Sequence, residues 1–139
     1  MLRRFRELES PPTKGHLSYN TGSESALDFL ASKLERCQGS HAQCQLLTSS
    51  TGYFPTRAVD VGGPDDGDVF VRDCSDVAKS SPYAALSHCW GGSQPVVLTA
   101  KTESKLRCGL PAHALPQTFQ DAILVCRKFG IRYLWIDSL

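Results

Sequence analysis

The sequence lacks a long hydrophobic run, a strong charge of either sign and a leader-like start. No apolar stretch approaches the roughly 18–20 residues that cross a bilayer, which argues against a membrane-spanning helix. A formal net charge of +1 over 139 residues gives no broad basic surface for nucleic acid or anionic lipid. The opening MLRRFRELES has no apolar segment behind its basic residues and does not fit a secretory signal. We therefore predict a cytoplasmic protein without nucleic-acid or membrane partners.

Six cysteines are present, which raises the question of disulfide bonds. Because no secretion signal precedes them, free thiols in a reducing compartment are favoured over a disulfide framework. They are Cys37, Cys44, Cys74, Cys89, Cys108 and Cys126.

Two of these cysteines and a histidine form the spacing C-x3-H-x2-C: Cys37, His41 and Cys44. The residue types and the short spacing suit zinc, but a structural zinc site has four protein ligands, so the fourth must come from elsewhere. On one unbroken helix the three would share a face, yet Gly39 argues against an unbroken helix. The alternative places Cys37 in the core and His41 in solvent.

The first part of the chain divides into an arm and a structured segment. Residues 1–22 are polar and are predicted to be a disordered arm. Residues 23–80 should hold a helix that begins near Thr21 or Ser23, with Thr21 and Glu24 as a capping box, and ends at Gly39. The alternating segments TRAVDV (56–61) and DVFVRD (68–73) then predict a β-hairpin.

The last part of the chain reads as strand, helix and strand. YAALSHC (83–89) and IRYLWIDSL (131–139) are apolar runs of strand length. Between them, LPQTFQDAILVCRKFG (115–130) has the periodicity of an amphipathic helix, with Thr118 as N-cap and Gly130 just past the end. This order predicts a βαβ unit and a parallel sheet. PVVLT (95–99) is a weaker candidate strand.

Polar side chains follow both apolar strands. The carboxyl ends of parallel strands meet at one edge of a sheet, where ligands gather. We therefore expect one group of residues, called the rim below, to come together there. The rim consists of Ser87, His88, Trp90, Gly91, Gly92, Asp137 and Ser138.

Within the rim, Asp137 and Trp90 are the candidate catalytic residues. Trp90 could stack on a planar ligand or belong to the core, whereas Trp135, in mid-strand, is assigned to the core. Asp121 has a structural explanation, because a carboxylate near a helix start is favoured there. Ser87 and His88 cannot form a catalytic pair on a strand, since adjacent side chains point to opposite faces.

Three blocks together resemble the heterokaryon-incompatibility (HET) domain of filamentous fungi. They are YAALSHCWGG (83–92), LPQTFQDAILVCRKFG (115–130) and RYLWIDSL (132–139). The connecting VLTAKTESKLRCGL is also similar, and LERCQGSHAQC (34–44) and PTRAVDV (55–61) resemble the region upstream of such domains.

The resemblance implies an α/β fold with a TIR-like or flavodoxin-like parallel sheet and flanking helices. It implies a role in non-self recognition and regulated cell death, through homotypic or signalling-protein assembly. The relation to TIR domains, some of which cleave NAD, suggests an NAD- or nucleotide-processing enzyme as an alternative.

The blocks assign residues 81–139 to the N-terminal part of a HET domain. The family continues beyond the WIDSL block, so we expect a truncated domain here. A non-functional remnant is therefore a third interpretation.

Overall fold

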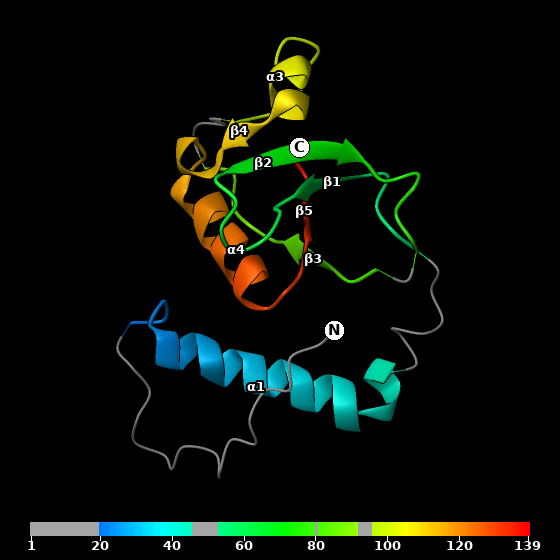
Figure 1. Cartoon of the computed structure of the whole chain (residues 1–139), viewed down its shortest axis with the longest axis vertical. Helices are drawn as coiled ribbons and strands as arrows, with labels where there is room; N and C mark the ends of the chain where they lie inside the picture. The colour runs from blue at the N-terminus through cyan, green and yellow to red at the C-terminus, as the bar shows by residue number, and fades with distance from the viewer. Residues whose placement is uncertain (1–19, 46–52, 80, 92–95) are drawn as a thin grey trace.

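The computed structural model describes residues 20–45, 53–79, 81–91 and 96–139, which form a five-stranded sheet with helices around it (Figure 1). The long helix α1 runs beneath the sheet and starts near the end of α4 (Figure 1). The elements are α1 (Glu24–Ser40), β1 (Arg57–Asp60), β2 (Asp68–Asp73), β3 (Tyr83–Leu86), α3 (Glu103–Cys108), β4 (Leu110–Pro111), a 3-10 turn (Ala112–Ala114), α4 (Gln117–Lys128) and β5 (Tyr133–Ile136).

The sheet has the strand order β3-β5-β1-β2-β4 and is mixed. β3 and β5 are parallel, as the βαβ prediction requires, while β1 runs antiparallel to both β5 and β2, and β2 antiparallel to β4. The predicted hairpin is confirmed. The predicted parallel sheet is confirmed only for β3 and β5. The sheet as a whole is mixed, because β1 of the hairpin pairs with β5 and lies in the middle of the sheet.

The core lies between α4 and one face of the sheet. Phe119, Ile123 and Cys126 of α4 are buried against Leu134 and Ile136 of β5. Burying a side chain of this size stabilises a fold by roughly 1.5–3 kcal/mol. The helical periodicity of residues 115–130 therefore identified the face of α4 that faces the core.

Trp135 is not part of this core. Leu134 and Ile136 point to α4, so the residue between them must point to the opposite face of the sheet. Trp135 is 38% exposed there. The assignment of Trp135 to the core is therefore wrong, because it treated β5 as a strand covered on both faces.

The sequence predicts the C-terminal end of α4 correctly but misplaces its N-terminal end. The N-cap is Pro116, whose carbonyl accepts hydrogen bonds from the backbone N–H groups of Phe119 and Gln120, so the prediction of Thr118 is wrong by two residues. At the other end, Gly130 adopts a left-handed φ of 68°. The N–H of Gly130 donates to the Arg127 carbonyl, and the N–H of Ile131 donates to the Cys126 carbonyl. These two bonds form a Schellman motif.

The predicted start of helix α1 near Ser23 is confirmed, whereas the capping box of Thr21 with Glu24 and the end at Gly39 are wrong. Ser23 is the N-cap, and its hydroxyl accepts from the N–H of Ala26 at 3.3 Å. The helix passes through Gly39 and stops at Ser40, so Gly39 is not its C-terminal signal. Gln45 explains this extension, because its side-chain amide donates to the carbonyls of Gln38 and Gly39 and satisfies the last turn.

Three further predictions fall partly outside the described residues or differ in detail. The arm predicted over residues 1–22 is described only from residue 20. Residues 96–99 are not a strand, although the Leu98 N–H bonds to the Ser138 carbonyl at 2.8 Å. β3 ends at Leu86, earlier than the predicted strand to Cys89.

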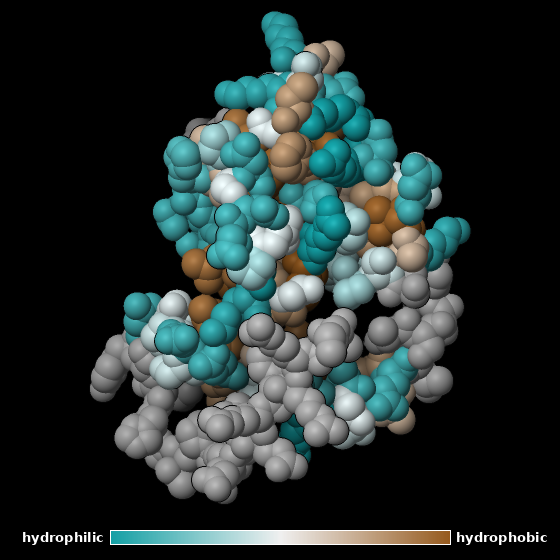
Figure 2. All heavy atoms as spheres, in the orientation of Figure 1, coloured by the Kyte–Doolittle hydropathy of each residue, from teal (hydrophilic) through white to brown (hydrophobic). Residues whose placement is uncertain are grey.

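Figure 2 shows a mostly hydrophilic face with small, separate hydrophobic areas. None of the helices in the described ranges combines the length and hydrophobicity needed to cross a bilayer.

A buried carboxylate fixes the start of β5 against the end of β1. Asp60 is 4% exposed and accepts two hydrogen bonds of 2.9 Å from the guanidinium of Arg132. It also accepts the Gly62 N–H and lies 3.4 Å from Arg72. Burial alone would raise the pKa of Asp60, but the Arg132 guanidinium and the Gly62 N–H hold this pKa below its ordinary value.

We predict that Asp60→Asn lowers the free energy of unfolding by about 2 kcal/mol at neutral pH, because Arg132 and Arg72 lose a buried anionic partner. The pKa of Asp60 is depressed in the folded state, so this stabilisation is complete above the ordinary value of 3.8 and is lost as the pH falls through the folded-state pKa. Denaturant titrations at several pH values should show the two proteins converging in acid. The exposed Asp65→Asn serves as the control, and an equal loss in both variants would contradict the prediction.

Candidate functional site

The register of β3 and β5 determines which side chains meet at the rim. Leu86 pairs with Ile136, the last residue of each strand. The chain therefore leaves both strands at the same level of the sheet, and the segments 87–91 and 137–139 lie next to each other.

Trp90 and Asp137 contact each other directly across this gap. The indole N–H of Trp90 donates to Oδ2 of Asp137 at 2.9 Å. Trp90 is 42% exposed, so the alternative that places it in the core is wrong. Its ring is held by a carboxylate while much of it faces solvent.

His88 approaches the same carboxylate from the core side. Its Nδ1 lies 3.9 Å from Oδ1 of Asp137, which is too long for a hydrogen bond. The imidazole side chain is only 13% exposed and packs edge-on against the Phe119 ring at 5.2 Å. Phe119 thus orients His88. The helical pattern of residues 115–130 predicted that Phe119 is buried, but it did not predict this contact.

Two buried polar atoms of the rim have no hydrogen-bond partner among the described residues. They are Nδ1 of His88 and Oγ of Ser138. Native proteins pair nearly all such atoms, and each one left unpaired costs about 1–3 kcal/mol. A partner for these atoms, such as a ligand or water, would remove this penalty.

The other predicted rim residues are exposed or lie outside the described residues. Ser87 is exposed. Gly91 has a left-handed φ of 67° with open space around it, which lets a ligand approach the backbone closely. Gly92 lies outside the described residues.

The structure adds a segment that the sequence did not assign to the rim. The Leu98 N–H bonds to the backbone carbonyl of Ser138 and holds residues 96–99 beside the end of β5. No pattern of spacing marks this contact, because it joins backbone groups 40 residues apart along a chain whose local sequence is merely apolar.

The prediction that Asp121 is favoured as a carboxylate at the start of the helix is wrong. The Asp121 carboxylate accepts the side-chain amide of Gln117 at 2.8 Å, one turn earlier on α4. With Pro116 as N-cap, Asp121 lies beyond the first turn and does not cap the helix.

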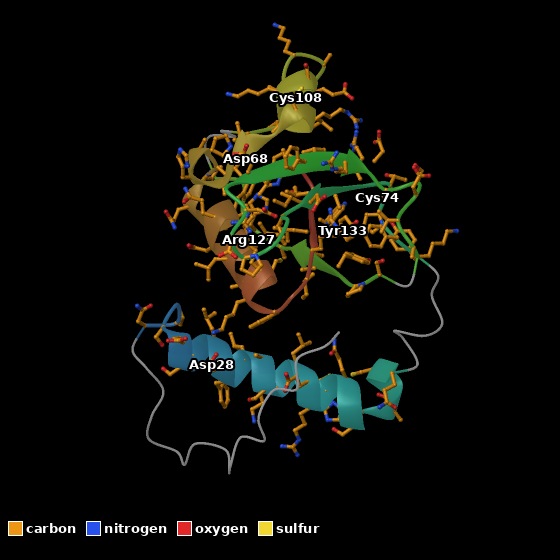
Figure 3. The ribbon with its side chains drawn as sticks, viewed as in Figure 1. Asp28, Asp68, Cys74, Cys108, Arg127 and Tyr133 are labelled. Carbon is orange, nitrogen blue, oxygen red and sulfur yellow. The ribbon has the colours of Figure 1, made fainter. Side chains whose placement is uncertain are left out.

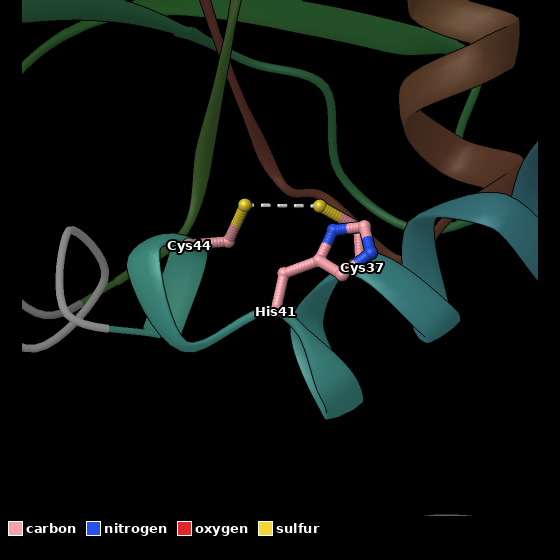
Figure 4. A group of neighbouring side chains, drawn as sticks. All are labelled: Cys37, His41 and Cys44. Atoms are coloured by element: carbon pink, nitrogen blue, oxygen red, sulfur yellow. Dashed lines mark hydrogen bonds between the residues drawn. The ribbon is translucent and has the colours of Figure 1, made fainter.

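The three predicted zinc ligands form a second cluster at the end of α1 (Figure 4). The sulfur atoms of Cys37 and Cys44 are 3.2 Å apart, and all three ligand atoms, including one from His41, lie within 4.8 Å of one another. The hydrogen bond between the two thiols raises the pKa of Cys37. No fourth His, Cys, Asp or Glu from the described ranges joins this group, and the described cysteines form no disulfide bond.

The arrangement at the rim predicts a small effect of Trp90 on stability. Trp90→Phe keeps an aromatic ring and removes one exposed hydrogen bond, so it should lower the free energy of unfolding by about 1 kcal/mol or less. Phe119→Ala, which opens a cavity in the core, should cost about 3–5 kcal/mol. Urea denaturation followed by circular dichroism compares the two. A loss for Trp90→Phe as large as that for Phe119→Ala would assign Trp90 to the core after all.

The C-terminal part of the chain matches one known protein family. Residues 83–139 match the family model described as Heterokaryon incompatibility protein (HET). This match confirms the resemblance from β3 to the end of the chain and includes every rim residue. No curated protein matches the chain, and neither does any solved structure.

Proposed function

We propose that this protein is a HET module that acts in non-self recognition and regulated cell death in a filamentous fungus. The observation that carries the proposal is the match of residues 83–139 to the HET family, which spans β3, α3, α4 and β5. These elements carry the rim and part of the core beneath it. A TIR-like or flavodoxin-like identity of the fold belongs to the same proposal. The parallel β3–β5 pair with α4 supports it, whereas the antiparallel β1 is a departure from a purely parallel sheet.

Assembly with a second copy of the chain is the mode of action that the sheet supports. β3 is an edge strand whose sequence, YAAL, carries no charge, and uncharged edges pair readily with further strands. Ala85 of β3 is directly opposite Trp135 of β5, and both are exposed on the face away from α4. Exposed tryptophan side chains are common anchors of protein interfaces.

We predict that Trp135→Ala weakens self-association by roughly 30-fold, as expected when an interface anchor worth about 2 kcal/mol is removed. Sedimentation velocity over a range of protein concentrations measures the association. Expression of the same variants in a filamentous fungus should show reduced cell death for Trp135→Ala. Leu124→Ala is the matched control, because Leu124 is 53% exposed on α4. A wild-type protein that stays monomeric and harmless at high expression would contradict this function.

The rim favours a second function, the processing of NAD or a related nucleotide. Trp90 offers an exposed ring for stacking, Asp137 offers a carboxylate that accepts hydrogen bonds, and His88 and Ser138 offer unpaired polar atoms. A planar base with a hydroxylated sugar has the groups to satisfy these partners. Asp137 would then be the acid or base and Trp90 the binding platform.

We predict that Asp137→Asn lowers kcat/KM for NAD cleavage by at least about 100-fold, the usual contribution of a positioned acid or base. Trp90→Ala should mainly raise KM. Product formation by the purified chain is followed by chromatography. Asp121→Asn is the control, since this carboxylate contacts Gln117 and lies outside the rim. Unchanged activity in Asp137→Asn would exclude the rim as the site.

A further inference from the structure

We propose that Cys37, His41 and Cys44 bind one zinc ion, with the fourth coordination position open to water or to an external ligand. This site is independent of the function proposed above, because it lies outside residues 83–139 and shares no residue with the rim.

The backbone brings the three side chains together without help from a metal. α1 ends at Ser40, and His41 adopts an extended conformation that turns the chain back. The His41 N–H bonds to the Cys37 carbonyl, and the Gln45 N–H bonds to the His41 carbonyl in the next turn. The Gln45 side chain also donates to the carbonyls of Gln38 and Gly39. Since these bonds hold the turn, ligand positions are fixed before an ion arrives, which favours binding.

The distances agree with a tetrahedral zinc site after small side-chain rotations. Zn–S and Zn–N bonds of about 2.3 and 2.0–2.1 Å place tetrahedral ligand atoms roughly 3.5–3.8 Å apart. The sulfur atoms of Cys37 and Cys44 are 3.2 Å apart, and no pair of ligand atoms exceeds 4.8 Å. Figure 4 shows the sulfur atom of Cys44 directed at that of Cys37, with the His41 ring beside it. A disulfide would need the sulfur atoms to close to about 2.05 Å and would leave His41 without a role.

Charge and exposure indicate an open site. Two thiolates balance the charge of Zn²⁺, and thiolate and imidazole ligands favour zinc over magnesium or calcium. Both cysteines are half-buried, while His41 is exposed. The metal would therefore lie at the surface with one side facing solvent, where a water molecule or an external donor can complete the tetrahedron.

The test uses the whole chain, purified without chelator and passed over a gel-filtration column. Elemental analysis should find one zinc per chain. Cobalt titrated into the zinc-free protein should give the visible and near-ultraviolet bands of tetrahedral cobalt with thiolate ligands. Absence of zinc together with absence of these cobalt bands would overturn the proposal. So would a wild-type protein whose Cys37 and Cys44 become titratable only after reduction, because that result identifies a disulfide.

Variants assign the metal to these three residues. Cys44→Ser should reduce the bound zinc to near zero, and His41→Cys should keep it, because a third thiolate replaces the imidazole. Cys108→Ser is the matched control, since Cys108 is exposed on α3, far from α1 (Figure 3). Equal zinc content in Cys44→Ser and Cys108→Ser would overturn the assignment even if the wild type binds zinc.

Discussion

The parallel pairing of β3 with β5 is the contact on which the candidate site depends. Its register places Leu86 opposite Ile136, so residues 87–91 and 137–139 emerge at one edge of the sheet. This register is in turn supported from the other side of β5. Asp60, at the end of β1, binds the guanidinium of Arg132 just before β5 begins.

A shift of β5 by one residue would break its contacts with α4 and the contact of Asp137 with Trp90. Because side chains alternate along a strand, Leu134 and Ile136 would turn away from α4 and Trp135 would enter the core. Asp137 would then move away from the indole of Trp90. The buried carboxylate of Asp60 and the apolar face of α4 therefore support the same register. The position of the rim therefore depends on the Asp60–Arg132 contact at the start of β5 as well as on the pairing with β3 at its end.

The sequence predicts well those features that depend on local pattern. The amphipathic stripe of α4, Gly130 at its C-terminal end and the hairpin of β1 with β2 follow from short-range signals, and all three are confirmed. Trp135 was misassigned because the face of a strand that remains uncovered depends on neighbours far along the chain. The central place of β1 has the same origin, since no local pattern tells a hairpin which third strand it will join.

The convergence of Trp90 with Asp137 is a different case, because a topological rule predicts it. Carboxyl ends of parallel strands share an edge, so two polar segments 47 residues apart are expected to meet, and they do so through a 2.9 Å hydrogen bond. The rule says nothing about His88, whose ring is oriented by Phe119, or about Ser138, whose hydroxyl is buried without a partner among the described residues. These details depend on packing, and packing is not visible in spacing alone.

The rim and the Cys37–His41–Cys44 cluster share no residue and belong to different elements. α1 meets α4 through ion pairs of Lys128 with Asp28 at 3.0 Å and with Glu24 at 3.8 Å. Such exposed pairs contribute about 0–1 kcal/mol each, and α1 also buries the side chain of Leu27. All three sulfur and imidazole ligands belong to the end of α1 and the turn after it, and none belongs to the sheet. An ion bound there would stiffen the end of α1 and would leave the β3–β5 register to Asp60 and α4.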